Sequence, residues 1–508
     1  MRKILLLSFI VVAQGALASA QEPANLLKLT ADDAVRMAID QNVDLAAERL
    51  DTQISDTGVA AANAAFHPAL TSGIERINQL QPAATFLIPF PTRDDAVTSS
   101  VGVSQKLRWL GTSYSASWTA GHTNSNSVLN TFNPVLQSGL TLNLSQPLLR
   151  DRRIDSPRLQ VAVSRKNREI ADTRFAETLV RTTADVKRAY WNLVSAKATV
   201  DARQSVFDLA EELARVNKAK VEVGESPPLD LVSAQAEVAA EEEGLIIAQT
   251  AVKQAEDRLR LLIFDPTDRA IWNRPIEPTD APPVGTATLD VEAAVDAALR
   301  DRADLLRART DLETTGINLD FAGNQRLPDV RVNASYAATG LGGTQLVRTA
   351  GFPGTIVGPG NATSFGSVLN QLLSSTYPTW SVGLSVNYPI GHSAEDAAYA
   401  RLRLEQAQAS ARLKSAEGRA IQEVRSAAWN VEMDAKRIDT TRAARELADQ
   451  RLDAERKRFD VGMSTSFLVI QAQRDLAQAK TNEVAAMLAY DLALVDFEAV
   501  QKAGTDSP

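Results

Sequence analysis

The longest stretch without an interior glycine or proline restricts the fold of this chain more than any other feature of its sequence. It extends from Pro157 to Val223. The stretch favours one helix of about 67 residues, roughly 100 Å long at about 1.5 Å per residue. A second run of similar length, Ser393–Val461, is interrupted only by Gly418. Because helices of this length cannot be buried in a globular domain, the sequence predicts long helices that pack side by side.

A heptad pattern supports this packing. Apolar or small residues spaced four and three apart occur at Leu179, Thr182, Val186, Ala189, Leu193, Ala196 and Val200. This spacing is typical of coiled-coil contacts with a neighbouring helix. Each long run ends at a Val-Gly pair, where Gly224 and Gly462 suit the left-handed position that terminates a helix. A second helix is expected to return over 229–263 and 467–500, so that each half of the chain contains a long helical hairpin.

The two halves are related by an internal repeat. Residues 29–70 align without a gap to residues 289–330, with identical residues at ten of the 42 positions. The order of the segments that follow also repeats, and the proline-rich segment 265–288 separates the halves. We therefore expect a signal peptide at 1–20, a first repeat at 21–264, a linker at 265–288, a second repeat at 289–500 and a tail at 501–508.

The first twenty residues have the pattern of an export signal. Basic residues at Arg2 and Lys3 precede a short apolar run, and Ala18-Ser19-Ala20 forms a cleavage site, which places the mature start at Gln21. The chain contains no cysteine, which excludes disulfides and thiolate chemistry. Its net charge of −8 argues against nucleic acid as a partner.

Segments with period-two alternation predict strands in both halves. They lie at about 69–79, 98–108, 112–122 and 137–147 in the first half and at about 329–338 and 380–389 in the second. A length of about 10 residues suits a tilted strand that crosses a membrane. A few strands per chain cannot close a barrel, so insertion into a membrane would require an oligomer. Ordinary packing in a soluble sheet stays open as the alternative.

The export signal, the duplicated order of elements, the Gln146-Pro147-Leu148-Leu149 strand ending and the Val-Gly tips together resemble the TolC-type outer-membrane efflux protein family (outer membrane factor). The resemblance implies a mainly α fold with membrane β structure, in which a trimeric β-barrel is continuous with a long α-helical barrel and each chain carries two structural repeats. It also implies an outer-membrane location in a Gram-negative-type bacterium, with a periplasmic extension. The typical barrel has four strands per chain, whereas an extra pair around Trp109 leaves four or six open here.

The implied function is that of an outer-membrane duct in a tripartite efflux or type I secretion system. Such a duct conducts substrates passively from an inner-membrane pump to the exterior. The implied partners are two further copies of the chain in a homotrimer, a periplasmic adaptor (membrane fusion) protein, the inner-membrane pump and outer-membrane lipid. An exported coiled-coil scaffold without a pore is the alternative, and it explains the helices but not the strands. The exported cargo, which could be a drug, a metal ion or a polypeptide, stays open.

The resemblance places the periplasmic entrance and the adaptor contacts at the two hairpin tips. The tip residues are Glu222, Val223, Gly224, Glu225, Ser226 and Asp230 in the first repeat, and Val461, Gly462, Met463 and Ser464 in the second. Leu468 and Gln471 stand where the best-known members carry acidic residues. The acidic residues of the first tip could nonetheless attract cations. Capping of the following helix by Ser226, Pro227 and Asp230 is an alternative interpretation of that tip.

No sequence motif indicates an enzyme. The chain lacks a phosphate-binding loop, a zinc-protease motif, a hydrolase nucleophile motif and a dinucleotide-binding glycine pattern. Its three histidines, His67, His122 and His392, are far apart in the sequence. We therefore predict no catalytic residues, no cofactor and no metal site.

Overall fold

The computed structural model describes residues 26–83, 90–269, 271–280, 289–351, 354–391 and 393–504. The predicted signal peptide, including its cleavage site at Ala18 and Ala20, lies outside the described residues. The described chain forms two compact units. The helical unit comprises described residues within Met1–Glu48, Ala176–Arg302 and Ala420–Pro508, and the sheet unit comprises Arg49–Phe175 and Ala303–Arg419. Nowhere in the described segments is a helix both long and apolar enough to span a membrane.

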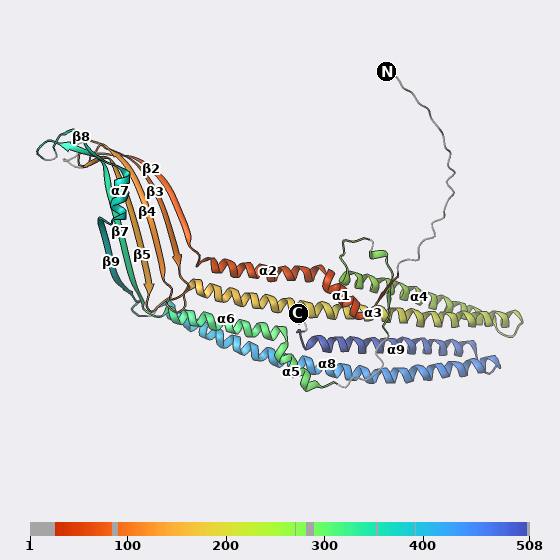
Figure 1. Ribbon diagram of the computed structural model, residues 1–508. Helices are drawn as coiled ribbons and strands as arrows, with labels where there is room; N and C mark the ends of the chain where they lie inside the picture. The colour runs from red at the N-terminus through yellow and green to blue at the C-terminus, as the bar shows by residue number, and fades with distance from the viewer. Residues whose placement is uncertain are drawn as a thin grey trace, which may run out of the picture. The chain divides into compact units, whose positions relative to one another are not determined.

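Both long helices have the predicted extent. They are α3 (Ser156–Glu222) and α8 (Ala394–Asp460), and each has 67 residues. The returning helices are α4 (Pro228–Ile263) and α9 (Ser466–Val500). Figure 1 shows the two hairpins, α3 with α4 and α8 with α9. The predicted pair of helical hairpins is therefore confirmed.

The internal repeat is visible in the shorter helices as well. These are α1 (Ala31–Gln41), α2 (Val43–Ala64), α5 (Val291–Asp301) and α6 (Ala303–Gln325). Helices α5 and α6 begin 260 residues after α1 and α2, which is the offset seen in the sequence. The side chains of Thr30 and Asp290, also 260 apart, cap α1 and α5 by accepting hydrogen bonds from backbone N–H groups in the first turn.

The helical unit buries one hydrophobic core in each repeat and a third that contains Leu213 of α3 together with residues of α8 and α9. The first core joins α1, α3 and α4 and contains Val186, Ala189 and Leu193 of the predicted heptad, all 5 % exposed or less. The second core joins α5, α8 and α9 around Val424 and Tyr490. The first core also includes Ile276 of β6 (Ile276–Pro278), a short strand that pairs in parallel with β1 (Leu27–Leu29). Part of the predicted 265–288 linker therefore packs into a core.

Within its described residues, the sheet unit contains one seven-stranded sheet. Its strands are β2 (Ala69–Gln81), β3 (Thr92–Lys106), β4 (Ser113–Ser125), β5 (Phe132–Pro147), β7 (Asp329–Arg348), β8 (Ile356–Thr363) and β9 (Tyr377–Asn387). The antiparallel order is β2-β3-β4-β5-β7, and both β8 and β9 pair with β7. Figure 1 shows the long strands side by side. All six predicted strands are present, but β3 begins earlier than predicted because Asp94 and Asp95 obscure its alternation.

The second repeat adds two elements that the sequence did not predict. Strand β7 pairs with β9 from Asp329 to Thr339 and with β8 from Gly343 to Arg348. Between these ladders the backbone N–H of Leu341 donates to the side chain of Gln371, which belongs to the short helix α7 (Phe365–Leu373). Helix α7 packs over Gly340 and Gly342, where an added Cβ would collide with Val368. The glycines thus provide the space in which this helix lies against the sheet.

Candidate functional site

The first hairpin tip is a helix-terminating turn built on Gly224. Its φ is +80°, and its N–H donates to the carbonyl of Val221 at 3.0 Å. The N–H of Glu225 donates to the carbonyl of Lys220 at 2.8 Å. These two bonds form the Schellman motif that commonly ends helices at a left-handed glycine. The predicted conformation of Gly224 is confirmed.

The second tip repeats the same turn. Gly462 has a φ of +76°, its N–H donates to Phe459 at 3.1 Å, and the N–H of Met463 donates to Arg458 at 2.8 Å. Both tips therefore end a 67-residue helix with the same hydrogen-bonded turn. The capping interpretation of the first tip needs correction in one respect. The residue before α4 is Pro227, which makes no side-chain cap, so Ser226 is not the capping residue.

The tips expose both apolar and acidic side chains. Large apolar residues are at least 70 % exposed at Val223, Leu229, Val461, Met463 and Phe467. Glu222 and Glu225 are exposed, and Asp230 is half-buried in the first turn of α4. At the second tip Gln471 donates to Asp475 at 3.0 Å. The tips therefore combine an apolar surface with the acidic groups of the first tip and with Asp460, which is exposed at the end of α8.

Near the tips, side chains of α3 in the first hairpin contact the second hairpin. The amide of Asn217, which is completely buried, donates to Ser466 Oγ at 2.6 Å and to the carbonyl of Asp230 at 3.4 Å. Lys220 donates to the carbonyl of Phe459 at 3.3 Å, and its ammonium lies 3.8 Å from the centre of the Phe459 ring. These contacts fix the first tip beside the second one within a chain.

An ion pair between α9 and α4 adds a further link. Arg474 Nε lies 2.9 and 3.1 Å from the two carboxylate oxygens of Glu237, and its Nη2 bonds to Oε2. The Glu237 side chain is 5 % exposed, whereas that of Arg474 is 58 % exposed. The hydrogen bond and the charge of Glu237 raise the pKa of Arg474 above its ordinary value. This bidentate pair is a charged link between the hairpins in which the carboxylate is buried.

The two faces of the sheet differ sharply in polarity. One face carries Leu140, Leu142 and Leu144 of β5, Tyr336 of β7, and Trp380, Val382, Leu384 and Val386 of β9. The opposite face carries Ser115 and Ser117 of β4, Thr141, Asn143 and Ser145 of β5, Asn333 and Ser335 of β7, and Ser381 and Ser385 of β9. An apolar outer face and a polar inner face are typical of strands in a transmembrane barrel. Trp118, Tyr336 and Trp380 all lie on the apolar face, as an aromatic girdle would.

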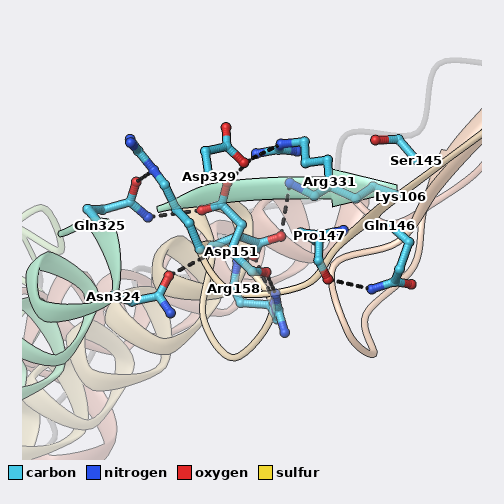
Figure 2. Close-up of polar contacts among 12 residues, drawn as sticks. Lys106, Ser145, Gln146, Pro147, Asp151, Arg158, Asn324, Gln325, Asp329 and Arg331 are labelled. Atoms are coloured by element: carbon cyan, nitrogen blue, oxygen red, sulfur yellow. Dashed lines mark hydrogen bonds and ion pairs between the residues drawn. The ribbon is translucent and has the colours of Figure 1, made fainter. Parts of the chain in front are cut away.

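A polar network lies where the strands meet the helices (Figure 2). Asp151 is at its centre, with a φ of +65°. Its carboxylate accepts from Gln325 at 2.9 Å and from Arg331 at 2.6 Å, and its N–H donates to Asn324 at 2.8 Å. The segment after β5 is therefore tied to the end of α6 and the start of β7, which come from the other repeat.

Asp155 anchors the start of α3 in the same network. Its side chain, 1 % exposed, accepts from the backbone N–H of Arg158 at 3.0 Å and lies 2.8 Å from Arg158 Nε and 2.9 Å from Lys106 Nζ. Burial by itself would raise the pKa of Asp155, but the hydrogen bonds from Arg158 and Lys106 outweigh it and hold this pKa below its ordinary value. The sequence did not reveal this network, because its members come from segments far apart in the chain.

Comparisons with known proteins agree with this architecture. The sequence matches the family described as outer membrane efflux protein over residues 34–263 and 294–500. The fold is similar to crystal structures of CusC (TM-score 0.68, 13 % identity, covering 94 % of this chain and 92 % of that one) and of VceC from Vibrio cholerae (0.64, 15 %, 93 % and 96 %). It is also similar to the open state of the MtrE outer membrane channel from Neisseria gonorrhoeae (0.60, 18 %, 93 % and 89 %). No functionally curated protein matches the sequence.

Proposed function

The chain belongs to the outer membrane efflux protein family and is an outer-membrane efflux channel with a periplasmic helical extension, and from this premise we propose that three copies form the duct of a tripartite export system. In this proposal an inner-membrane pump and a periplasmic adaptor deliver the substrate to the hairpin tips. The predicted fold class, outer-membrane location and family are confirmed. The homotrimer, the adaptor and the pump are proposed for this chain from its family.

The observation that carries the proposal is the sheet. Its strands have one apolar and one polar face, yet the described sheet of a single chain is open at β2 on one side and at β8 and β9 on the other. An open edge cannot face lipid, because no water is present there to bond its N–H and C=O groups. Closure with further copies satisfies both edges and places the polar face around a lumen. The competing scaffold function gives no reason for this division of polarity.

The duct works passively in this proposal. Family and fold are those of channel proteins rather than of known enzymes. The sequence carries no nucleotide-binding motif, so the energy for export has to come from the pump. The chain contributes a path, and selectivity along that path depends on the side chains that line it.

The tips are the proposed entrance and adaptor contact. Exposed apolar residues such as Val223, Val461 and Met463 provide a surface that a partner could cover. The acidic residues Glu225 and Asp230, present once in each of three chains, would make the mouth attractive to cations. Their effect should decrease with added salt over a Debye length of about 8–10 Å.

Assembly is tested by extraction. The full chain should be recovered with the outer-membrane fraction and migrate as a trimer in mild detergent. The protein part of its mass, with the bound detergent subtracted, should be three times that of the mature chain. Recovery as a soluble periplasmic monomer would contradict the membrane function and favour a scaffold.

The entrance is tested by ion selectivity in planar bilayers. The variant with Glu225→Gln and Asp230→Asn should lose much of the cation preference that the reversal potential of the wild type reports. Glu242→Gln with Glu243→Gln, two exposed positions further along α4, is the control with the same change in charge. An unchanged reversal potential in the tip variant, or an equal loss in the control, would show that the tip carboxylates do not set the selectivity.

A further inference from the structure

The described sheet contains more membrane-length strands than the four per chain that are typical of the family. Strands β2, β3, β4, β5, β7 and β9 have between 11 and 20 residues each. About 9–11 residues suffice to cross the membrane at the tilt of a barrel strand. The remaining strand, β8, has 8 residues and pairs only with the last part of β7. Six strands of the described sheet are therefore long enough to span the membrane.

We propose that β2 of each chain pairs with β9 of the next copy, so that the closed outer-membrane barrel has eighteen strands, six from each chain. This inference rests on the proposed homotrimer and goes beyond it, because it specifies the seam and the size of the barrel. With four strands per chain the same trimer would close with twelve.

The additional hairpin, β3 with β4, is an integral part of the sheet. Strand β3 pairs with β2 without a register shift, from the pair Ala69 and Ser104 to the pair Gln81 and Thr92. Strand β4 pairs with β5 in the same way, from Ser113 and Ser145 to Thr123 and Val135. Close to the β3–β4 turn the alternation of the hairpin also matches that of its neighbours, and further along β2 and β3 the Arg76–Asp95 ion pair interrupts the apolar face. Val101, Val103 and Trp118 lie on the apolar face, whereas Ser115 and Ser117 lie on the polar one. A hairpin held on both sides in one register belongs to the barrel wall.

The turn of this hairpin is locked into the network at the strand–helix junction. Lys106 at the end of β3 forms the ion pair with buried Asp155. Gln146 donates to the carbonyl of Leu110 at 3.0 Å and accepts a hydrogen bond from Thr112. A Cβ on Gly111, whose φ is +68°, would lie 2.5 Å from the carbonyl oxygen of Asp151, so only glycine allows this close approach. The turn and the start of α3 are thus built to fit each other.

The two free edges are compatible with each other. Because the wall strands alternate in direction and are even in number, β2 and β9 run in opposite directions, and identical copies can join them as antiparallel neighbours. Polarity continues across such a seam. Leu70 and Ile74 of β2 share the apolar face with Val382 of β9. A second copy of this chain is therefore the partner that fits each edge.

Cysteine cross-linking tests the seam, and the absence of native cysteine gives a clean background. One cysteine is placed on the polar face of β2, at Thr71 or Gly73, and the other on the same face of β9, at Ser381, Gly383 or Ser385. Oxidation of the membrane-embedded protein should convert at least one of these pairs to covalent dimers and trimers. Single-cysteine variants should stay monomeric on a non-reducing gel, because the disulfide requires both edges.

A twelve-stranded wall formed without β2 and β3 would bring a different strand to the seam, whereas one formed without the additional hairpin β3–β4 would keep the β2–β9 seam and is distinguished by the diameter of the barrel. If β2 and β3 lay outside the wall, β9 would meet β4 of the next copy. Cysteines at Ser115 or Ser117 of β4, combined with the same β9 positions, would then cross-link the trimer. Such cross-links, without any between β2 and β9, would overturn the proposal while leaving the trimeric duct intact. Failure to recover a trimer at all would instead contradict the proposed function.

The diameter of the barrel provides a second test. Barrel diameter increases roughly linearly with strand number, so eighteen strands give a wall about 1.5 times as wide as twelve at equal tilt. End-on electron-microscopy views of the trimer in lipid nanodiscs measure this width. The matched variant lacks residues 92–125, which joins β2 to β5 through a shorter connection and leaves four wall strands per chain. The wild-type barrel should be about 1.5 times as wide as this variant, and equal widths would overturn the proposal.

Discussion

The Arg474–Glu237 pair yields a prediction about how the two hairpins hold together. Arg474 lies on α9 of the second hairpin, and Glu237 lies on α4 of the first. The change Arg474→Met keeps most of the length of the side chain and removes its charge. It leaves the carboxylate of Glu237, only 5 % exposed, without its bidentate partner. We therefore expect Arg474→Met to loosen the contact between the hairpins.

The size of the effect follows from the burial of each partner. Removing one member of a fully buried pair costs about 3–5 kcal/mol, whereas exposed pairs contribute about 0–1 kcal/mol. Glu237 is buried, but 58 % of the Arg474 side chain is exposed, so water can reach the carboxylate once the guanidinium is absent. A loss of about 1–3 kcal/mol in the free energy of unfolding is expected. Adding Glu237→Gln should recover about half of it, because the stranded charge is removed as well.

The assay measures the unfolding of the solubilised protein through the circular dichroism of its helices. A double-mutant cycle compares the wild type, Arg474→Met, Glu237→Gln and the double variant. The control is Arg451→Met, because Arg451 pairs at 2.8 Å with Asp475 inside the second hairpin and both side chains are largely or partly exposed. The control should lose no more than about 0.5 kcal/mol. Equal losses for Arg474→Met and Arg451→Met, or a coupling energy near zero in the cycle, would refute the reasoning.

Three further changes have defined outcomes. Gly462→Ala should strain the left-handed turn at the second tip by about 1 kcal/mol and impair export more than it impairs trimer stability, as an export assay beside a melting curve would show. Burial raises the pKa of Asp491 from 3.8 to about 7, so ionisation should cost stability as the pH rises from about 4 to 7, and Asp491→Asn should flatten this part of the stability profile. The pKa of Asp155 is instead lowered, so the ionised carboxylate should stabilise the fold above its ordinary pKa near 4, and this stabilisation should be lost as the pH falls. Asp155→Asn should therefore lower the free energy of unfolding by about 1–3 kcal/mol at pH 7 and change it little in acid.

Local patterns were sufficient to predict much of this fold from the sequence. A long helix can be recognised from a run without glycine or proline, and its end from the Val-Gly pair that follows. Both signals lie in residues that are neighbours in the sequence. The two tips at Gly224 and Gly462 could therefore be predicted with their backbone conformation. The constant offset of 260 residues located the second copy of each short element from the first.

Contacts between distant segments could not be predicted in this way. Asn217 and Ser466 are 249 residues apart, and nothing in the local sequence of either indicates the other. The pairing of Arg474 with Glu237 depends in the same way on how the two hairpins pack. Helix α7 was missed because its apolar run is short and its cradle, at Gly340 and Gly342, lies in a strand some 25 residues earlier in the chain.

The inserted hairpin β3–β4 also bears on how such a chain can evolve. Its two strands are antiparallel, so β5 runs in the same direction with the hairpin as without it. The start of α3 therefore stays at the same end of the sheet. The described part of the second repeat has no such hairpin of long strands, because β7 pairs directly with β9. One gene segment could thus widen a trimeric pore by six strands while the duplicated helices keep their length, their direction and their tips. Pore width and helical length are then separate heritable traits, which selection can change one at a time.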